Sequence, residues 1–268
     1  MPALAIVIIA VLTIMVVGLG NIALNYRVRV RRAQDERHGS PIPLIPLEQF
    51  DPVFAHGPFG PTTAAEVRLL GEGDGVPGGT TDRETWILAA LAKRAACLFE
   101  FGTCTGKTAY LWAVNSKPTA MIRTLTLRPS DRPMYESAPG DSAEATEFAL
   151  NESAFAEFLY TDTAAAAKIT QLYGDSKHFD ESLLAGQCDL IFIDGSHASS
   201  YVKSDTAKAL RMVAPGGVIL WHDYRGPTGT TKDVFNHLNV LCKTRSLVRF
   251  AHTSLVAYRA PAGAPRDG

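Results

Sequence analysis

Short apolar runs alternate with helical patterns from Thr81 to Arg259, and no other feature of the sequence constrains the fold as strongly. We expect strands at residues 97–101, 121–127, 168–173, 190–193, 217–221, 247–251 and 254–259, and helices at 107–115, 143–158, 201–212 and 232–243. This alternation predicts an α/β fold with a mainly parallel sheet covered on both faces. Only His252 and Thr253 separate the last two strands, so these should form a hairpin with an antiparallel strand.

A capping signal marks the start of this region. Thr81 and Glu84 have the spacing of a capping box, in which a hydroxyl and a carboxylate satisfy free amides at a helix start. Residues 25–80 before it carry a basic flank and then a linker rich in proline and glycine, which breaks helices. Its apolar side chains suggest that parts of it pack on the domain: Leu44, Ile45, Phe50, Phe54 and Phe59. We therefore expect one α/β domain at residues 81–260 and a disordered tail at 261–268.

The N-terminal residues 3–24 contain no charged side chain. A helix needs about 20 mainly apolar residues to cross the hydrocarbon core of a membrane. Tyr26 and four arginines between residues 27 and 32 follow, as is typical of a cytoplasmic flank. A cleaved signal peptide would instead carry its basic residues before the apolar run. We expect a single-pass transmembrane anchor at 3–24, with the domain at 81–260 in the cytoplasm.

Charge and cysteine usage exclude several classes of function. The formal net charge is -1, so no basic field favours binding to nucleic acid. The four cysteines form no CxxC pair, which argues against a zinc knuckle or a thioredoxin-type site. Residues 133–167 contain acidic side chains but no Lys or Arg. We expect a solvated helix face there, with a lid over the site as the alternative.

A glycine loop follows the first strand of the domain. Phe101 ends the strand, Gly102 and Gly106 follow, and a helix begins at Lys107. Glycines allow a tight turn and close approach to a ligand, and a helix N-terminus offers free N–H groups. Cys104 replaces the second glycine of the dinucleotide fingerprint, and the glycine spacing is one residue short for a P-loop. The loop therefore indicates a ligand site that takes neither NAD nor ATP.

Polar side chains stand at the expected carboxyl ends of four strands. They are Glu100, Asp175, Asp194 and the pair His222-Asp223. Ligands of parallel sheets bind beyond these ends, so the four positions should share one site. Carboxylates there could accept from an amine or bind Mg²⁺, whereas an imidazole suits a softer ion. An ordinary turn would explain Gly174-Asp175-Ser176 alone, but not all four ends together.

Together these segments resemble class I S-adenosylmethionine-dependent methyltransferases, and most of all the branch of sugar and macrolide O-methyltransferases and cephalosporin-hydroxylase-like proteins. The segments that carry the resemblance are residues 99–106, 174–176, 192–197 and 215–223. The resemblance covers roughly residues 81–259. It implies a Rossmann-like, seven-stranded sheet, mostly parallel with a C-terminal antiparallel hairpin, and S-adenosyl-L-methionine bound over the glycine loop.

The resemblance also implies a set of site residues. Those expected at the cofactor are Glu100, Gly102, Thr103, Cys104, Gly106, Thr126, Asp175, Ser176 and Asp194. Metal-dependent members hold a divalent ion between the ends of two neighbouring strands, which here carry Asp194, His222 and Asp223; we expect Mg²⁺ there. Many members bind both ribose hydroxyls with an acidic residue where this chain has Thr126, whose hydroxyl makes only one such bond. Asp131 in the following loop is a candidate substitute.

We expect Asp194 and His197 to be catalytic. His197 is the candidate base because imidazole titrates near neutral pH, although it could instead cap the next helix. The expected reaction is O-methylation of a small-molecule or sugar- or lipid-linked hydroxyl at the cytoplasmic membrane face. Two alternatives stay open: a non-catalytic, membrane-tethered binding module with the same fold, and a related hydroxylase-like enzyme. A homo-oligomer is also compatible with the sequence.

Overall fold

The computed structural model describes residues 39–70 and 79–263. The chain divides into two compact units, residues 1–40 and 41–268. The predicted transmembrane anchor at 3–24 lies outside the described residues. In the two described ranges, no helix combines the length and the apolar character that a membrane crossing requires. The anchor and the cytoplasmic location therefore stay predictions.

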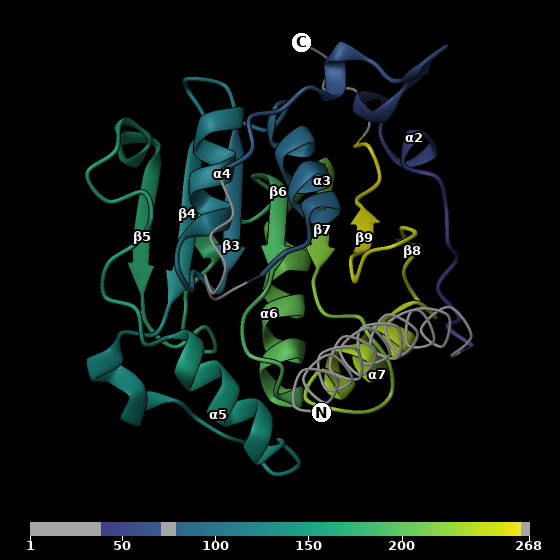
Figure 1. The fold of residues 1–268 in the computed structure, drawn as a ribbon. Helices are drawn as coiled ribbons and strands as arrows, with labels where there is room; N and C mark the ends of the chain where they lie inside the picture. The colour runs from purple at the N-terminus through teal and green to yellow at the C-terminus, as the bar shows by residue number, and fades with distance from the viewer. Residues whose placement is uncertain (1–38, 71–78, 264–268) are drawn as a thin grey trace, which may run out of the picture. The chain divides into compact units, whose positions relative to one another are not determined.

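A seven-stranded sheet forms the centre of the unit 41–268 (Figure 1). Its strands are β3 (Cys97–Phe101), β4 (Met121–Thr126), β5 (Ile169–Tyr173), β6 (Cys188–Ile193), β7 (Val213–Trp221), β8 (Leu247–Arg249) and β9 (Val256–Arg259). They lie in the order β5-β4-β3-β6-β7-β9-β8. Strands β3 to β7 pair in parallel, whereas β9 is antiparallel to both β7 and β8. The predicted Rossmann-like sheet with a C-terminal antiparallel hairpin is confirmed.

Helices cover both faces of this sheet (Figure 1). They are α3 (Asp82–Ala92) and α4 (Lys107–Asn115) on one face and α6 (Ser199–Met212) and α7 (Lys232–Leu241) on the other, while α5 (Ala143–Glu152) lies beyond the carboxyl ends of the strands. Successive strand residues point to opposite faces, so Leu190 and Phe192 of β6 pack with α3 and α4, while Ile191 and Ile193 pack with α6 and α7. Because both faces are buried, the central strands are continuous apolar runs rather than alternating ones.

The lead-in before α3 packs on the domain, so the compact unit begins at Pro41, ahead of the predicted boundary at Thr81. Its elements are α2 (Leu47–Phe50), β1 (His56–Gly57) and β2 (Gly60–Pro61). Ile45 N donates to Arg249 O at 3.1 Å, which fixes the lead-in beside β8. Phe54 is fully buried against Trp86, whereas Phe59 is fully exposed. The predicted packing therefore holds for only some of the apolar side chains.

The helix predicted at 143–158 ends at Glu152 in α5. The chain then turns back toward the glycine loop, where Leu159 N donates to Thr105 O at 2.9 Å. Phe158 and Tyr160 are buried there as a stacked pair. A continuous helix could not return these two rings to the loop. Near the C-terminus, Pro261 O accepts a hydrogen bond from Gly216 N, so the ordered chain continues past residue 260, the predicted end of the domain. Residues 264–268 of the predicted tail lie outside the described residues.

Candidate functional site

The glycine loop between β3 and α4 passes close to the end of β6. Gly102 has a φ of 97°, and a Cβ at this position would lie 2.1 Å from the carbonyl oxygen of Asp194. At Gly106 a Cβ would lie 2.6 Å from the ring of Tyr160. Both glycines are therefore required by contacts within the protein, and not only by ligand approach as the sequence suggested. Cys104 between them also adopts a left-handed conformation, with a φ of 44°.

A cleft of about 590 Å³ opens beyond the carboxyl ends of β3, β4, β5 and β6. Among the predicted cofactor residues, Gly102, Cys104, Thr126, Asp175, Ser176 and Asp194 line it. Glu100, Thr103 and Gly106 do not, and neither does Asp131. The cleft also has apolar walls, to which Leu125 and Leu127 contribute. It is the type of concave, partly apolar site that binds small molecules.

Glu100 lies beneath this cleft rather than in it. It is 1% exposed, and Thr124 Oγ1 on the neighbouring strand donates to its Oε2 at 2.6 Å. The hydroxyls of Thr103 and Thr124 are 2.7 Å apart, so Thr103 belongs to the same buried network. Burial, reinforced by the charge of Asp194, raises the pKa of Glu100 to about 8 despite the threonine hydrogen bonds. Glu100 is therefore buried behind the residues that line the cleft.

At the β5 end of the cleft, the Asp175 carboxylate is held by the protein. Tyr201 OH donates to Asp175 Oδ2 at 2.6 Å, and Lys177 N donates to Oδ1 at 2.8 Å. The ring of Tyr135 stacks on that of Tyr201 at 4.4 Å, and its hydroxyl lies 2.7 Å from Ser196 Oγ. The sequence analysis missed this tyrosine pair, because the two residues are far apart in the chain and neither belongs to a motif.

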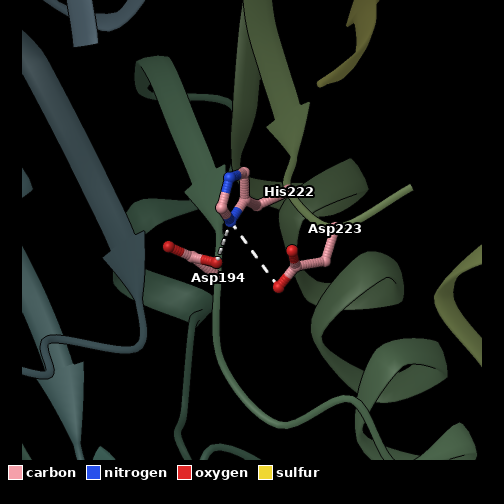
Figure 2. Close-up of side chains that lie close together, drawn as sticks. All are labelled: Asp194, His222 and Asp223. Carbon is pink, nitrogen blue, oxygen red and sulfur yellow. Dashed lines mark hydrogen bonds and ion pairs between the residues drawn. The ribbon is translucent and has the colours of Figure 1, made fainter. Parts of the chain in front are cut away.

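A second group of side chains lies where β6 and β7 end (Figure 2). His222 Nδ1 is 2.8 Å from Asp194 Oδ1 and 3.6 Å from Asp223 Oδ2. One ligand atom from each of these three residues lies within 4.8 Å of the others. Asp223 has a φ of 61°, and its Oδ1 also contacts Arg225 at 2.7 Å. The structure thus brings the predicted metal ligands together, and two carboxylates with an imidazole suit a divalent ion.

His197 joins this group through Asp223. Its Nε2 lies 2.8 Å from Asp223 Oδ2, and its ring stacks on Phe148 of α5 at 5.1 Å. Helix α6 has Ala198 as its N-cap and shows no side-chain capping bond. The alternative that His197 caps this helix is therefore wrong. His197 is instead buried beside Asp223, and these two residues form the strand-end cluster together with Asp194 and His222.

Residues 99–224 match the family model described as a methyltransferase domain. Over these residues the chain is similar to methyltransferases. The matched residues include the glycine loop, the cleft and the strand-end cluster. No curated protein sequence matches the chain.

Several solved structures resemble this chain at low identity. The O-methyltransferase TomG from Streptomyces achromogenes, solved in complex with SAM, is 14% identical and has a TM-score of 0.44; the match covers 69% of this chain and 82% of that one. The SAH-bound methyltransferase PaMTH1 from Podospora anserina is 16% identical, has a TM-score of 0.47 and matches over 69% and 80%. An O-methyltransferase from Bacillus cereus in complex with SAH is 15% identical, has a TM-score of 0.44 and matches over 69% and 84%.

His197 and His222 have raised pKa values. Burial disfavours the charged form of His222, but the charge and hydrogen bond of Asp194, with Glu84 and Asp223, raise its pKa well above the ordinary value. Burial likewise opposes charge on His197, and the hydrogen bond and charge of Asp223 raise its pKa nonetheless. Each imidazole thus offsets carboxylate charge within the cluster.

Glu152, the last residue of α5, adds a carboxylate that the sequence analysis did not select. It lines the cleft, and burial followed by the charge of Asp194 raises its pKa to about 7. The lack of basic residues in 133–167 was the available signal, and it was interpreted as a solvated face. The contacts of Phe148 and Glu152 favour the lid alternative for α5.

Asp194 lies at the junction of two cavities. With Gly195 and Ser196 it lines both the large cleft and a smaller cavity of about 240 Å³, which His197 and His222 also line. A ligand in the cleft would therefore reach Asp194 beside His197 and His222.

Proposed function

We propose that this protein is an S-adenosylmethionine-dependent O-methyltransferase. The observation that carries the proposal is the position of Asp194 between the cleft and the cluster of His197, His222 and Asp223. Cofactor bound along the cleft supplies an activated methyl group, so the protein has to align the acceptor and take its proton. The cleft reaches from the glycine loop to Asp175 and Ser176, and its apolar middle and polar ends suit a nucleoside-bearing ligand.

Asp194, His222 and Asp223 would hold a divalent ion. When bound, such an ion supplies Lewis acidity that lowers the pKa of an acceptor hydroxyl. His197 takes the proton in this proposal. Its Nε2 faces Asp223, so the lone pair of the neutral ring is at Nδ1, which is buried with no hydrogen-bond partner among the described residues. Phe148 stacks on the imidazole and excludes water from one of its faces.

The non-catalytic alternative explains this cluster less well. Burying several ionisable side chains together costs free energy, and a module that only bound a cofactor would not need His197 paired with Asp223. Thr126 lines the cleft with a hydroxyl in place of an acidic side chain. A single hydroxyl lowers the affinity for a ribose compared with a carboxylate, but it does not prevent binding.

The acceptor is proposed to be a hydroxyl on a small molecule or on a sugar- or lipid-linked molecule at the membrane face. The uncharged run at 3–24 and the arginines after it support the membrane part of this proposal. The acceptor can be sought by incubating the full chain and methyl-labelled cofactor with a membrane extract, and then identifying the labelled products.

Metal removal tests the mechanism. The same labelling reaction is run after exhaustive chelation and again after a divalent ion is restored. We expect labelling to disappear and to return with the metal, while S-adenosylhomocysteine still raises the Tm of the chelated protein. Full labelling without metal would remove His222 and Asp223 as catalytic ligands. Failure of S-adenosylmethionine and S-adenosylhomocysteine to bind at all would contradict the methyltransferase proposal itself.

A further inference from the structure

The two ring nitrogens of His222 face different carboxylates. Nδ1 faces Asp194 and Asp223, as Figure 2 shows. On the opposite side of the ring, Nε2 lies 3.5 Å from Glu84 Oε2. The side chain of His222 is 6% exposed and that of Glu84 is 3% exposed, so this contact is shielded from water. Carboxylates therefore flank both ring nitrogens, at hydrogen-bond distance on the Asp194 side and at ion-pair distance on the Glu84 side.

Glu84 is itself held in place by two segments of the chain. Its Oε2 accepts from Thr81 N and Oγ1 at 2.8 and 2.9 Å, which completes the capping box of α3. Its Oε1 accepts from Ser254 N and Oγ at 2.6 and 2.9 Å, in the turn between β8 and β9. The capping box needs only the Thr81 contacts. The burial and the contacts to Ser254 and His222 exceed what a helix cap requires.

A fixed carboxylate beside Nε2 has a direct effect on Nδ1. Without an ion, Nδ1 lies 2.8 Å from Asp194 Oδ1, which only accepts, so Nδ1 carries a proton. An ion bound at Nδ1 would replace that proton, and the one proton left on the neutral ring would be on Nε2, beside Glu84. The lone pair then lies at Nδ1, on the side of Asp194 and Asp223. A carboxylate that accepts from the second nitrogen of a metal-bound histidine orients the ring and increases its basicity as a ligand. Glu84 is the one described carboxylate within ion-pair distance of Nε2.

The nitrogen ligand also bears on which ion the site takes. Mg²⁺ favours oxygen ligands in a regular octahedron, whereas imidazole favours first-row transition ions. We infer that Glu84 is a positioning residue that presents His222 Nδ1 to the ion, and that the Asp194–His222–Asp223 site therefore takes a transition ion such as Mn²⁺ in preference to Mg²⁺. This inference rests on the metal-dependent function proposed above, and it replaces Mg²⁺, the ion expected from the sequence.

The experiment titrates the full chain with Mn²⁺ alone, and with Mg²⁺ as a competitor, and follows binding by calorimetry. Pulsed electron paramagnetic resonance on the Mn²⁺ complex reports whether an imidazole nitrogen is coordinated. We expect Mn²⁺ to bind more tightly than Mg²⁺ and to show nitrogen coupling that His222→Ala abolishes. Equal affinity for the two ions, or no nitrogen coupling in the wild type, would overturn the inference.

Two variants separate positioning from helix capping. Glu84→Gln should weaken Mn²⁺ binding by about 10- to 100-fold, the usual cost of losing a carboxylate behind a metal-bound histidine. Thr81→Ala removes the capping hydroxyl but leaves the Glu84 carboxylate beside His222, so it should bind Mn²⁺ like the wild type. Equal losses in both variants would mean that Glu84 acts only through the helix, which sinks the positioning role.

S-adenosylhomocysteine affinity is measured in the same samples as the control for fold. If Glu84→Gln does not fold, Glu84→Asp keeps the charge but withdraws it from Nε2 by one methylene, and the same loss of Mn²⁺ affinity is required of it. A wild type that binds S-adenosylhomocysteine but no Mn²⁺ overturns this inference and leaves the methyltransferase proposal standing. A wild type that binds Mn²⁺ but not S-adenosylhomocysteine would contradict the methyltransferase proposal and leave the inferred metal preference standing.

Discussion

His197 Nε2 lies 2.8 Å from Asp223 Oδ2, although one residue follows β6 and the other follows β7. The side chains are 6% and 10% exposed, so the pair is largely removed from water. Hydrogen bonds to a charged partner in such surroundings are stronger than hydrogen bonds at a surface. The pair therefore fixes the position of the proposed base relative to the proposed metal ligands.

Replacing His197 tests its role as a base. His197→Gln should lower turnover by about 10²- to 10⁴-fold, the range usual for loss of a general base. Affinity for S-adenosylhomocysteine should not change, because His197 does not line the large cleft. His178→Gln is the matched control, since His178 is an exposed histidine that also pairs with a carboxylate, Glu136. Turnover equal to that of the control would assign proton transfer to another group.

Tyr201 should support cofactor binding through Asp175. Tyr201→Phe removes the hydroxyl that donates to Asp175 Oδ2 and accepts from Glu136 N. Loss of a buried bond to a charged group costs about 1.5–3 kcal/mol, so affinity for S-adenosylhomocysteine should fall at least about tenfold in calorimetry. Tyr258→Phe on β9, outside the cleft, serves as the control. Unchanged affinity in Tyr201→Phe would show that the tyrosine pair is not part of the cofactor site.

Glu100 makes stability depend on pH in a defined direction. Its pKa is raised to about 8 in the folded protein, from 4.5, so its neutral form is the one that folding favours. The contribution is fully present below pH 4.5 and is lost as the pH rises through 8. Glu100→Gln stays neutral, so its Tm relative to the wild type should increase between pH 5 and pH 9. A Tm difference that stays constant over this range would contradict the raised pKa.

The Gly102 contact predicts a loss of fold rather than a selective loss of binding. In Gly102→Ala the new Cβ would meet the Asp194 backbone, which cannot give way as the end of a flexible side chain can. Overpacking of this kind costs about 1–3 kcal/mol, and the positive φ adds strain. Thermal unfolding should show a clear loss of stability, whereas Gly57→Ala, with its nearest contact at 3.8 Å, should be nearly neutral. An unchanged Tm for Gly102→Ala would show that the loop can move away from β6.

The N-terminal segment predicts membrane attachment. The full chain should sediment with membranes and resist extraction by high salt, because its attachment would be apolar rather than ionic. A chain that starts at Gly39 should stay in the supernatant and remain folded, since the compact unit begins at Pro41. Fractionation followed by immunoblotting compares the two. A full chain found in the supernatant would remove the anchor from the proposed function.

Local sequence patterns were enough to predict the sheet and the residues at its strand ends. Continuous apolar runs mark strands buried on both faces, and the carboxyl ends of parallel strands meet at one edge, so Asp194 and Asp223 had to be neighbours. The sequence predictions that differ from the structure concern features that depend on contacts between distant segments of the chain. The helix at α5 ends early because Phe158 and Tyr160 pack against the glycine loop. Glu100 does not line the cleft, and its carboxyl group instead accepts a hydrogen bond from Thr124 on the neighbouring strand.

Glu84 illustrates the same limit. Its spacing from Thr81 predicted the capping box correctly, because that motif is local. Its bonds to Ser254 join residues 170 positions apart, and no local pattern reveals them. The role inferred for Glu84 beside His222 could therefore be recognised only in the folded chain.

The separation of 170 positions between Glu84 and Ser254 determines when their hydrogen bonds can form during synthesis of the chain. The ribosome synthesises Glu84 early, and its bonds to Thr81 can form as soon as α3 emerges. Its bonds to Ser254 have to wait for the turn between β8 and β9, close to the end of translation. A nascent or prematurely terminated chain that lacks this turn contains every proposed catalytic residue but has no fully anchored support for His222. Completion of the polypeptide thereby becomes a condition for assembling the strand-end cluster.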